Sequence, residues 1–351
     1  MKRRRKIQTP CVATCLAALI FCLSACTTRN QALRTTAPAK TFPPASTPAG
    51  AITRPVLPAP GAQEPETRVI PTNPSCKRIV FSLYNPGSLV NLYSTCPDGS
   101  GLTPLSEGAG NNGGSAWDPA GAQIAFVSDR SGKNQVYRMA MGSGQPTQLT
   151  FEQQNDSPVW LPGGQKIAFR TTDGQGLWWW RILDMDSGTI TEFSQPSYDF
   201  FFQRPAWSPD GSRLALMSLE EQRKRNDGSS QIHVRPVNGG NESALTNDTW
   251  ANILPAWSPD GRLIAFLSER DGNYNQYALY TMETDGANLR RLTAPDYSET
   301  TSFSWSGDSR QIAIGSLETG QIEILDLATG NLRPLLENEP DRTTGQPAWQ
   351  P

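Results

Sequence analysis

From residue 76 onward, apolar runs of four to six residues alternate with polar segments rich in Gly, Asp and Pro. Runs of this length between turn residues are typical of β-strands rather than helices. The clearest copies, 205–216 and 255–266, combine a Pro-Ala-Trp strand, a Ser-Pro-Asp-Gly turn and an apolar second strand. Pro fixes φ at the second turn position, which favours this turn. An alternating third strand and a short fourth strand, such as 291–293, complete the pattern.

The four-strand pattern is an internal repeat. Weaker copies begin at residues 115, 158 and 303. Equivalent tryptophans recur every 43 to 50 residues, at Trp117, Trp160, Trp207, Trp257, Trp305 and Trp349. Repeats of short strands with periods of roughly 40–50 residues are typical of the blades of a β-propeller.

The two ends of the repeat array complement each other. Residues 78–105 contain a second, third and fourth strand without a Pro-Ala-Trp strand before them, and residues 347–351 supply that strand alone. Joining both pieces to the five complete copies leaves no open sheet edge at the seam. The sequence therefore predicts an all-β fold, a six-bladed β-propeller over 76–351 that is closed by the C-terminal strand 347–351.

The segment before the repeat predicts an export signal. Residues 1–6 are basic, and residues 11–23 form an apolar run that fits a signal peptide but is too short to span a membrane. The run leads into Leu-Ser-Ala-Cys at 23–26, which resembles the bacterial lipobox. The resemblance implies a lipoprotein signal peptide over 1–25 and lipidation of Cys26. An ordinary signal peptide with an incidental cysteine is the alternative.

Residues 26–75 are expected to form a disordered tether. The 49 positions after Cys26 contain 10 Pro, 9 Thr and 8 Ala, with few large apolar residues. Such a segment cannot bury enough surface to offset its conformational entropy. The resemblance to Gram-negative lipoproteins implies, through Thr27, an anchor in the outer membrane that faces the periplasm. In another envelope type, the anchor would lie in the outer face of the cell membrane.

Charge and composition narrow the function classes. The formal net charge is −2, and cleavage would remove five basic residues and no acid, which leaves a more acidic body and argues against nucleic acid as a partner. The single histidine, His233, lies in a predicted strand, where we interpret it as a packed side chain. Neither a G-x-S-x-G motif nor a phosphate-binding loop occurs. We expect no enzymatic activity, no cofactor and no metal site.

Two cysteines, Cys76 and Cys96, belong to the predicted propeller. Their midpoint falls in the turn at 85–88, so they are expected to face each other across one hairpin. Export places them in an oxidising compartment. We predict a disulfide between them, with two free thiols as the alternative.

The repeat resembles the propeller of TolB and its relatives, whose unit reads roughly Pro-Ala-Trp-Ser-Pro-Asp-Gly, then an Ile-Ala-Phe strand and finally Arg-Leu-Thr. The resemblance covers about 76–351 and implies the fold more than an activity, because such blades serve binding proteins and regulatory domains of peptidases. TolB carries an α/β domain before its propeller, where this chain has the predicted tether. TolB is also a soluble periplasmic protein, whereas this sequence predicts a lipoprotein.

Aromatic and acidic residues interleave on the connections from each fourth strand to the next first strand. These connections are expected to surround the central channel on one face. Such a mixture is typical of a protein-binding surface. The candidate partner-binding residues are Asp156, Tyr198, Asp199, Phe201, Trp250, Tyr297, Glu299 and Arg342.

The leading hypothesis is a monomeric, lipid-anchored propeller of the cell envelope that binds a protein or peptide without catalysis, or serves as a scaffold. The alternative is a carbohydrate-binding or carbohydrate-processing propeller with acidic residues at the channel mouth. In that case the run at 178–180, Trp-Trp-Trp, would stack on sugar rings. The same tryptophans could instead fill the space between two blades.

Overall fold

The structure, a computed structural model, describes residues 76–85, 87–106, 108, 110–194, 204–218, 229–272, 275–298, 301–316, 320–336 and 343–351. The predicted signal peptide, Cys26 and the predicted tether lie outside the described residues. The described residues form 24 β-strands, and no described segment forms a helix long and apolar enough to cross a membrane.

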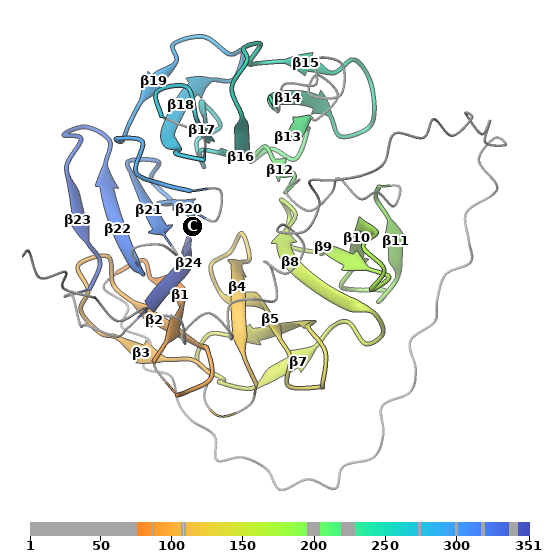
Figure 1. Cartoon of the computed structure of the whole chain (residues 1–351). Helices are drawn as coiled ribbons and strands as arrows, with labels where there is room; N and C mark the ends of the chain where they lie inside the picture. Colours follow the sequence, from red (N-terminus) through yellow and green to blue (C-terminus); the bar gives the residue numbers. More distant parts are fainter. Residues whose placement is uncertain are drawn as a thin grey trace, which may run out of the picture. The chain divides into compact units, whose positions relative to one another are not determined.

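The strands form six sheets of four strands, which we number as blades 1 to 6 (Figure 1). The strand bounds are β1 (Ile79–Tyr84), β2 (Asn91–Thr95), β3 (Thr103–Pro104), β4 (Asn112–Trp117), β5 (Gln123–Ser128), β6 (Gln135–Ala140), β7 (Pro146–Gln148), β8 (Gln154–Trp160), β9 (Lys166–Thr172), β10 (Trp178–Asp184), β11 (Ile190–Glu192), β12 (Ala206–Trp207), β13 (Arg213–Ser218), β14 (Gln231–Pro236), β15 (Ser243–Ala244), β16 (Asn252–Trp257), β17 (Leu263–Ser268), β18 (Ala278–Glu283), β19 (Arg290–Arg291), β20 (Ser302–Trp305), β21 (Gln311–Ser316), β22 (Gln321–Asp326), β23 (Leu332–Pro334) and β24 (Thr343–Trp349).

Blade 1 is built from both ends of the described chain. Its strand order is β24-β1-β2-β3, whereas blades 2 to 6 each use four consecutive strands, beginning with β4, β8, β12, β16 and β20. In the antiparallel pair of β1 and β24, Ile79 lies opposite Trp349 and Val80 lies opposite Ala348. The predicted six-bladed propeller, closed by the C-terminal strand, is therefore confirmed. Figure 1 shows the first strand of each blade around the centre.

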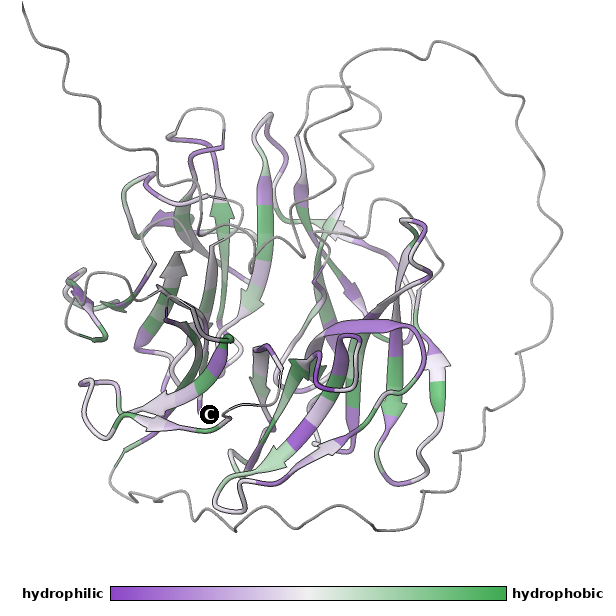
Figure 2. Ribbon diagram, turned by 60° about the horizontal axis from the view of Figure 1, so that its bottom comes forward, coloured by the Kyte–Doolittle hydropathy of each residue, from purple (hydrophilic) through white to green (hydrophobic). Residues whose placement is uncertain are grey.

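The hydrophobic core consists of six clusters, one between each pair of adjacent blades. Strand β1 illustrates the arrangement. Ile79 and Phe81 pack against blade 6, and Val80 between them packs against blade 2. Successive side chains of a strand point to opposite faces, so a second strand between two neighbours needs a continuous apolar run. Figure 2 shows the resulting hydrophobic stretches along the strands.

Three of the recurring tryptophans join the inner strands of adjacent blades through hydrogen bonds, whereas the indole nitrogens of Trp160 and Trp207 have no hydrogen-bond partner within the described residues. The indole nitrogen of Trp117 donates a hydrogen bond of 3.0 Å to the carbonyl oxygen of Ala348 across the closure. Trp257 bonds in the same way to Ala206 at 3.1 Å, and Trp305 to Ala256 at 3.3 Å. At these three junctions the recurring tryptophan supplies the buried ring, and the alanine of a Pro-Ala-Trp segment in the preceding blade supplies the carbonyl.

The inner strands begin earlier than the sequence pattern predicts. We expected them to start at the Pro-Ala-Trp segment and took the preceding residues as loops. In blades 1, 2, 3 and 5 the strand instead extends several residues before this segment through a β-bulge. The residue three positions before the tryptophan has a positive φ of 51–57° in these four blades: Gly114, Ser157, Leu254 and Gln346. In blades 1, 3 and 5 the next residue is a proline, which lacks an N–H donor and is accommodated by the bulge, whereas blade 2 has Ser115 at this position.

The Ser-x-Asp-Gly turns between first and second strands are held by their own side chains. In blade 4, Ser208 Oγ donates to the Asp210 carboxylate and accepts a hydrogen bond of 2.9 Å from the Arg213 backbone. The hydrogen bonds from Ser208 and Ser212 lower the pKa of Asp210 to about 2. Gly211 follows with φ of 71°, a conformation that glycine adopts without steric cost.

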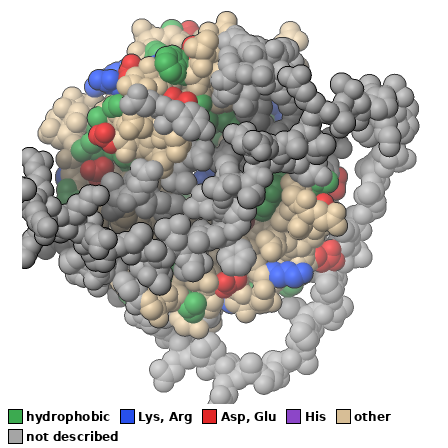
Figure 3. Space-filling model, viewed as in Figure 1, with side chains coloured by type: hydrophobic (Ala, Val, Ile, Leu, Met, Phe, Trp, Pro, Cys, Tyr) green, Lys and Arg blue, Asp and Glu red, His purple; other side chains and the backbone are tan. Residues whose placement is uncertain are grey.

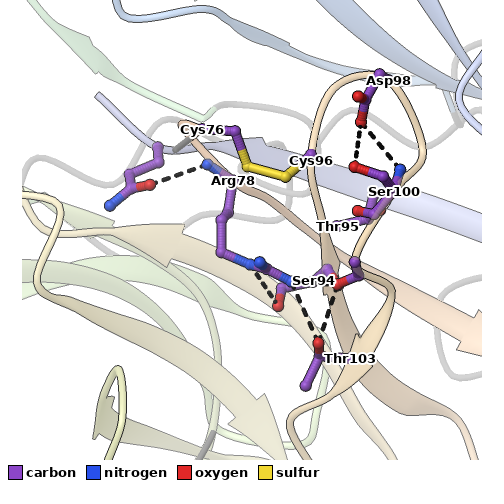
Figure 4. Close-up of a disulfide and its surroundings, with 10 residues drawn as sticks. Cys76, Arg78, Ser94, Thr95, Cys96, Asp98, Ser100 and Thr103 are labelled. Carbon is purple, nitrogen blue, oxygen red and sulfur yellow. Dashed lines mark hydrogen bonds between the residues drawn. A yellow bond between two sulfur atoms is a disulfide. The ribbon is translucent and has the colours of Figure 1, made fainter. Parts of the chain in front are cut away.

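In the structure, Cys76 and Cys96 form a disulfide with their Cα atoms 5.8 Å apart (Figure 4). The register of β1 with β2 pairs Ile79 with Thr95, so Cys76 lies diagonal to Cys96 rather than directly opposite as expected. Beside the disulfide, the buried Arg78 side chain donates to Ser94 Oγ at 3.0 Å. The backbone N–H of Arg78 donates to Gln350 Oε1 at 2.9 Å. The disulfide therefore lies next to the strand pair that closes the propeller.

Candidate functional site

One end of the propeller carries the connections from each fourth strand to the next first strand, together with those between second and third strands. Both sets lie at the same end because neighbouring strands are antiparallel. We call this end the loop face, and its described residues include 129–134, 151–153, 247–251 and 269–272. Figure 3 shows hydrophobic, acidic and basic side chains interspersed on the surface seen in the orientation of Figure 1.

A buried glutamine fastens the connection between blades 4 and 5. Gln231 Oε1 accepts a hydrogen bond of 2.7 Å from Thr246 Oγ1, and Gln231 Nε2 donates to the Asp248 carbonyl at 2.8 Å. Asn252, on β16, donates to Gln231 Oε1 at 3.4 Å and to Asp248 Oδ1 at 2.9 Å. Buried polar groups with satisfied hydrogen bonds restrict the conformation of the segment that they join. The backbone of this connection is therefore well fixed.

The same arrangement fastens the connection between blades 2 and 3. Gln135 Oε1 accepts hydrogen bonds from Thr150 Oγ1 at 2.7 Å and from Asn155 Nδ2 at 2.9 Å. Gln135 Nε2 donates to the Gln153 carbonyl at 2.6 Å. Sequence reasoning missed these residues. The signal that could have found them is the repeated spacing, because the threonine follows the glutamine by 15 residues and the asparagine follows it by 20 or 21.

An arginine after the second strand supports the connection between blades 4 and 5. Arg270 donates to Asp248 Oδ2 at 2.8 Å and to Asn252 Oδ1 at 3.1 Å. Its guanidinium carbon lies 5.0 Å from the centroid of the Tyr280 ring. Charge-assisted hydrogen bonds and the cation–π contact together hold this side chain in place. Sequence reasoning did not single out Arg270.

Trp250 is an exposed aromatic residue on this fixed connection. Trp250 is 42% exposed, while its backbone N–H donates to Asp248 Oδ1 at 3.0 Å. Its carbonyl accepts a hydrogen bond of 3.2 Å from Asn252 Nδ2. Phe151, which was not among the candidate residues, is 51% exposed on the connection between blades 2 and 3. Large apolar side chains on a fixed backbone are suited to anchor a binding partner, because little backbone freedom is lost on association.

Two other candidate residues are engaged within the propeller. Asp156 lies on β8 and receives two hydrogen bonds of 2.8 Å from the Arg170 guanidinium. The exposed fractions of these side chains are 19% for Asp156 and 7% for Arg170. Tyr297 is 6% exposed and belongs to the core between blades 5 and 6, where its hydroxyl donates to Glu323 Oε2 at 3.0 Å. Burial and the Glu323 charge raise the pKa of Tyr297. Tyr297 is therefore a core residue and not a surface contact.

The other five candidate partner-binding residues lie in segments that the structure does not describe. Tyr198, Asp199, Phe201, Glu299 and Arg342 lie outside the described residues. Their assignment to the partner-binding surface stays a prediction from the sequence.

The tryptophan run at 178–180 does not form an open sugar-stacking surface. Trp179 and Trp180 are buried, and Trp180 packs in the cluster between blades 3 and 4. Trp178 is half-buried, and the Arg170 guanidinium carbon lies 4.2 Å from its ring centroid. Packing therefore accounts for the tryptophan run, which is one of the two features behind the carbohydrate alternative. Within the described parts of the chain, no group of three His, Cys, Asp or Glu side chains could hold a metal ion.

The architecture defines the chain as a six-bladed β-propeller whose loop face carries fixed connections with exposed aromatic residues. Its sequence matches the family described as the TolB beta propeller domain over residues 68–200 and 181–351. The chain belongs to this family, and the TolB-like propeller predicted from the repeat is confirmed.

Individual relatives are more distant. The chain is 28% identical over 162 residues to the protein named TolB homolog of Chlorobium luteolum, with 45% of this chain and 34% of that protein covered. It is 29% identical over 140 residues to the uncharacterized protein Atu1656 of Agrobacterium fabrum, with 36% of this chain and 46% of that protein covered. The matched segments thus span less than half the length of either relative.

Among solved structures, the chain is similar to TolB from Acinetobacter baumannii with a TM-score of 0.66 and 21% sequence identity. The similarity covers 78% of this chain and 67% of that chain. At this identity the comparison shows the shared fold alone.

Proposed function

We propose that this chain is a lipid-anchored propeller of the cell envelope that binds a protein or peptide through its loop face and catalyses no reaction. The observation that carries the proposal is the presentation of Trp250. Its side chain is open to solvent, while Asp248 and Asn252 fix its backbone on both sides. Tryptophan is enriched among the residues that dominate binding energy at protein interfaces.

The chemistry of the described loop face also favours binding over catalysis. The carboxylates of Asp156 and Asp248 are bound by Arg170 and Arg270. A carboxylate that accepts charge-assisted hydrogen bonds from an arginine is held in place by that ion pair. These acids therefore serve to fix the connections and leave the exposed aromatic side chains as the natural contacts.

The anchoring part of the proposal rests on the lipobox-like segment that ends at Cys26. A lipidated cysteine followed by an extended tether would hold the propeller in the envelope at a distance from the membrane surface. Replacement of Cys26 by Ser is expected to release the protein from the membrane fraction. A Cys26→Ser variant that remained in the membrane fraction would contradict the anchor.

The binding proposal is tested by affinity purification of the full-length chain from solubilised envelopes. The comparison uses Trp250→Ala and a matched variant, Leu289→Ala, which removes an exposed apolar side chain between third and fourth strands at the opposite end of blade 5. We expect specific partners to be depleted with Trp250→Ala and retained with Leu289→Ala. Equal capture by both variants and the wild type would argue against binding through the loop face.

A further inference from the structure

Arg204 lies just before β12, the innermost strand of blade 4, and differs in charge from its equivalents in the other blades. It lies three residues before Trp207, at the place where the other five blades have uncharged residues: Gly114, Ser157, Leu254, Ser302 and Gln346. It is exposed, and its guanidinium donates a long hydrogen bond of 3.5 Å to the carbonyl of Pro158 on β8. Arg204 therefore reaches across the junction between the innermost strands of two blades.

The charges at this junction are unbalanced. Asp156 is bound by Arg170 through two hydrogen bonds of 2.8 Å, and no carboxylate within the described residues pairs with Arg204. The positive charge of Arg170 acts on Arg204, so no neighbouring charge within the described residues balances it. An exposed arginine in this situation is stabilised by a ligand that supplies a negative charge.

Apolar side chains flank this position on the neighbouring connections. Phe151 precedes blade 3 and Trp250 precedes blade 5, so the three connections are consecutive around the ring. Arginine combined with exposed aromatic residues is typical of protein interfaces. The guanidinium also matches the geometry of a carboxylate, to which it can donate two parallel hydrogen bonds.

We propose that Arg204 binds a carboxylate of an acidic peptide segment that also contacts the apolar side chains of the loop face. The proposal deepens the function proposed above and rests on it, because it names the chemistry of the partner. The expected ligand is a segment with Asp or Glu close to apolar residues.

The test uses the full-length chain and a displayed library of random decapeptides, with sequencing of the bound fraction. Arg204→Gln removes the charge and keeps hydrogen-bonding capacity. Arg262→Gln makes the same change in a turn between first and second strands, at the opposite end of the propeller. We expect the wild type and Arg262→Gln to enrich peptides that combine Asp or Glu with apolar residues. Arg204→Gln should bind the enriched peptides about tenfold more weakly or worse, the size expected for loss of a charged hydrogen bond.

The outcomes separate this proposal from the function on which it rests. Enrichment of apolar peptides without acidic residues overturns the carboxylate site and leaves peptide binding by the loop face intact. Equal affinity of the acidic peptides for Arg204→Gln and the wild type has the same meaning. A library without any enriched peptide contradicts both proposals. The midpoint of thermal unfolding is measured for each variant as a control. A midpoint equal to that of the wild type shows that a loss of binding does not come from a loss of folding.

Discussion

The indole nitrogen of Trp117 lies 3.0 Å from the carbonyl oxygen of Ala348, a residue 231 positions further along the sequence. This contact joins the first strand of blade 2 to the C-terminal strand that completes blade 1. It belongs to the same series as the Trp257 and Trp305 contacts within the array. The seam of the ring is thus built like the junctions between blades 4 and 5 and between blades 5 and 6, and the stability of the propeller depends on both ends of the repeat array.

Replacement of Trp349 by Ala should lower the free energy of unfolding by about 3–5 kcal/mol, because the side chain is buried in the core between blades 6 and 1. The matched change Trp250→Ala should alter it by no more than about 0.5 kcal/mol, because that side chain is exposed. Denaturant titration of both variants checks the difference. Similar effects of the two changes would show that the closing strand contributes little to stability.

Loss of the disulfide should destabilise the same seam. The bond joins cysteines 20 residues apart, and a loop of this size predicts a loss of about 2–3 kcal/mol when both cysteines are replaced by Ser. Denaturant titration of the wild type with and without reductant should reproduce the loss, while the double variant should no longer respond to reductant. A wild-type protein that is equally stable with and without reductant would contradict this role.

The Ser-x-Asp turns between first and second strands predict a dependence of stability on pH. The pKa of Asp210 is lowered to about 2 by hydrogen bonds from Ser208 and Ser212, and that of Asp308 is lowered mainly by a hydrogen bond from Ser306. A carboxyl whose pKa is lower in the folded state adds stability above its unfolded pKa of about 4, and this stability is lost as the pH falls toward 2.

Unfolding of the wild type and of Asp210→Asn between pH 2 and pH 6 measures this contribution. The variant should lose part of the decline at acidic pH, because it has no charge to neutralise. Ser208→Ala should raise the pKa of Asp210 in an NMR titration, since it removes the first donor. An unchanged Asp210 pKa in Ser208→Ala would show that the hydrogen bond is not the cause.

The buried glutamines predict local rather than global changes in dynamics. Gln231→Ala should increase hydrogen exchange in residues 247–251, and Gln135→Ala should do so in residues 151–155, because each side chain fastens one connection. Each change leaves buried partners unsatisfied and should cost about 1–3 kcal/mol. Exchange that rose equally in both connections with either variant would mean that the glutamines act through general stability.

The arrangement of the blades could be predicted from the sequence because the repeat carries it directly. The spacing from Trp117 to Trp349 and the missing first strand before residue 78 were enough to predict six sheets and their closure. These features follow from strand periodicity and from the cost of an open sheet edge, and both rules can be applied to the order of residues along the chain alone.

The residues of the loop face were harder to predict, because proline was taken as the start of each inner strand. On an innermost strand the missing N–H of Pro255 or Pro158 costs little, since that edge has no neighbouring strand. The strand therefore continues through the bulge, and Asp156 becomes a strand residue that pairs with Arg170. The burial of Tyr297 depends on contacts with β22 that no local pattern contains.

Photocrosslinking in intact cells tests the central claim most directly. The photoreactive residue p-benzoylphenylalanine is placed at position 249, an exposed site beside Trp250, or at position 289 at the opposite end of blade 5. The account predicts a discrete crosslinked protein from position 249 that disappears when Trp250→Ala is added, and no such product from position 289. The same product from both positions, or from neither, would contradict partner binding through the loop face.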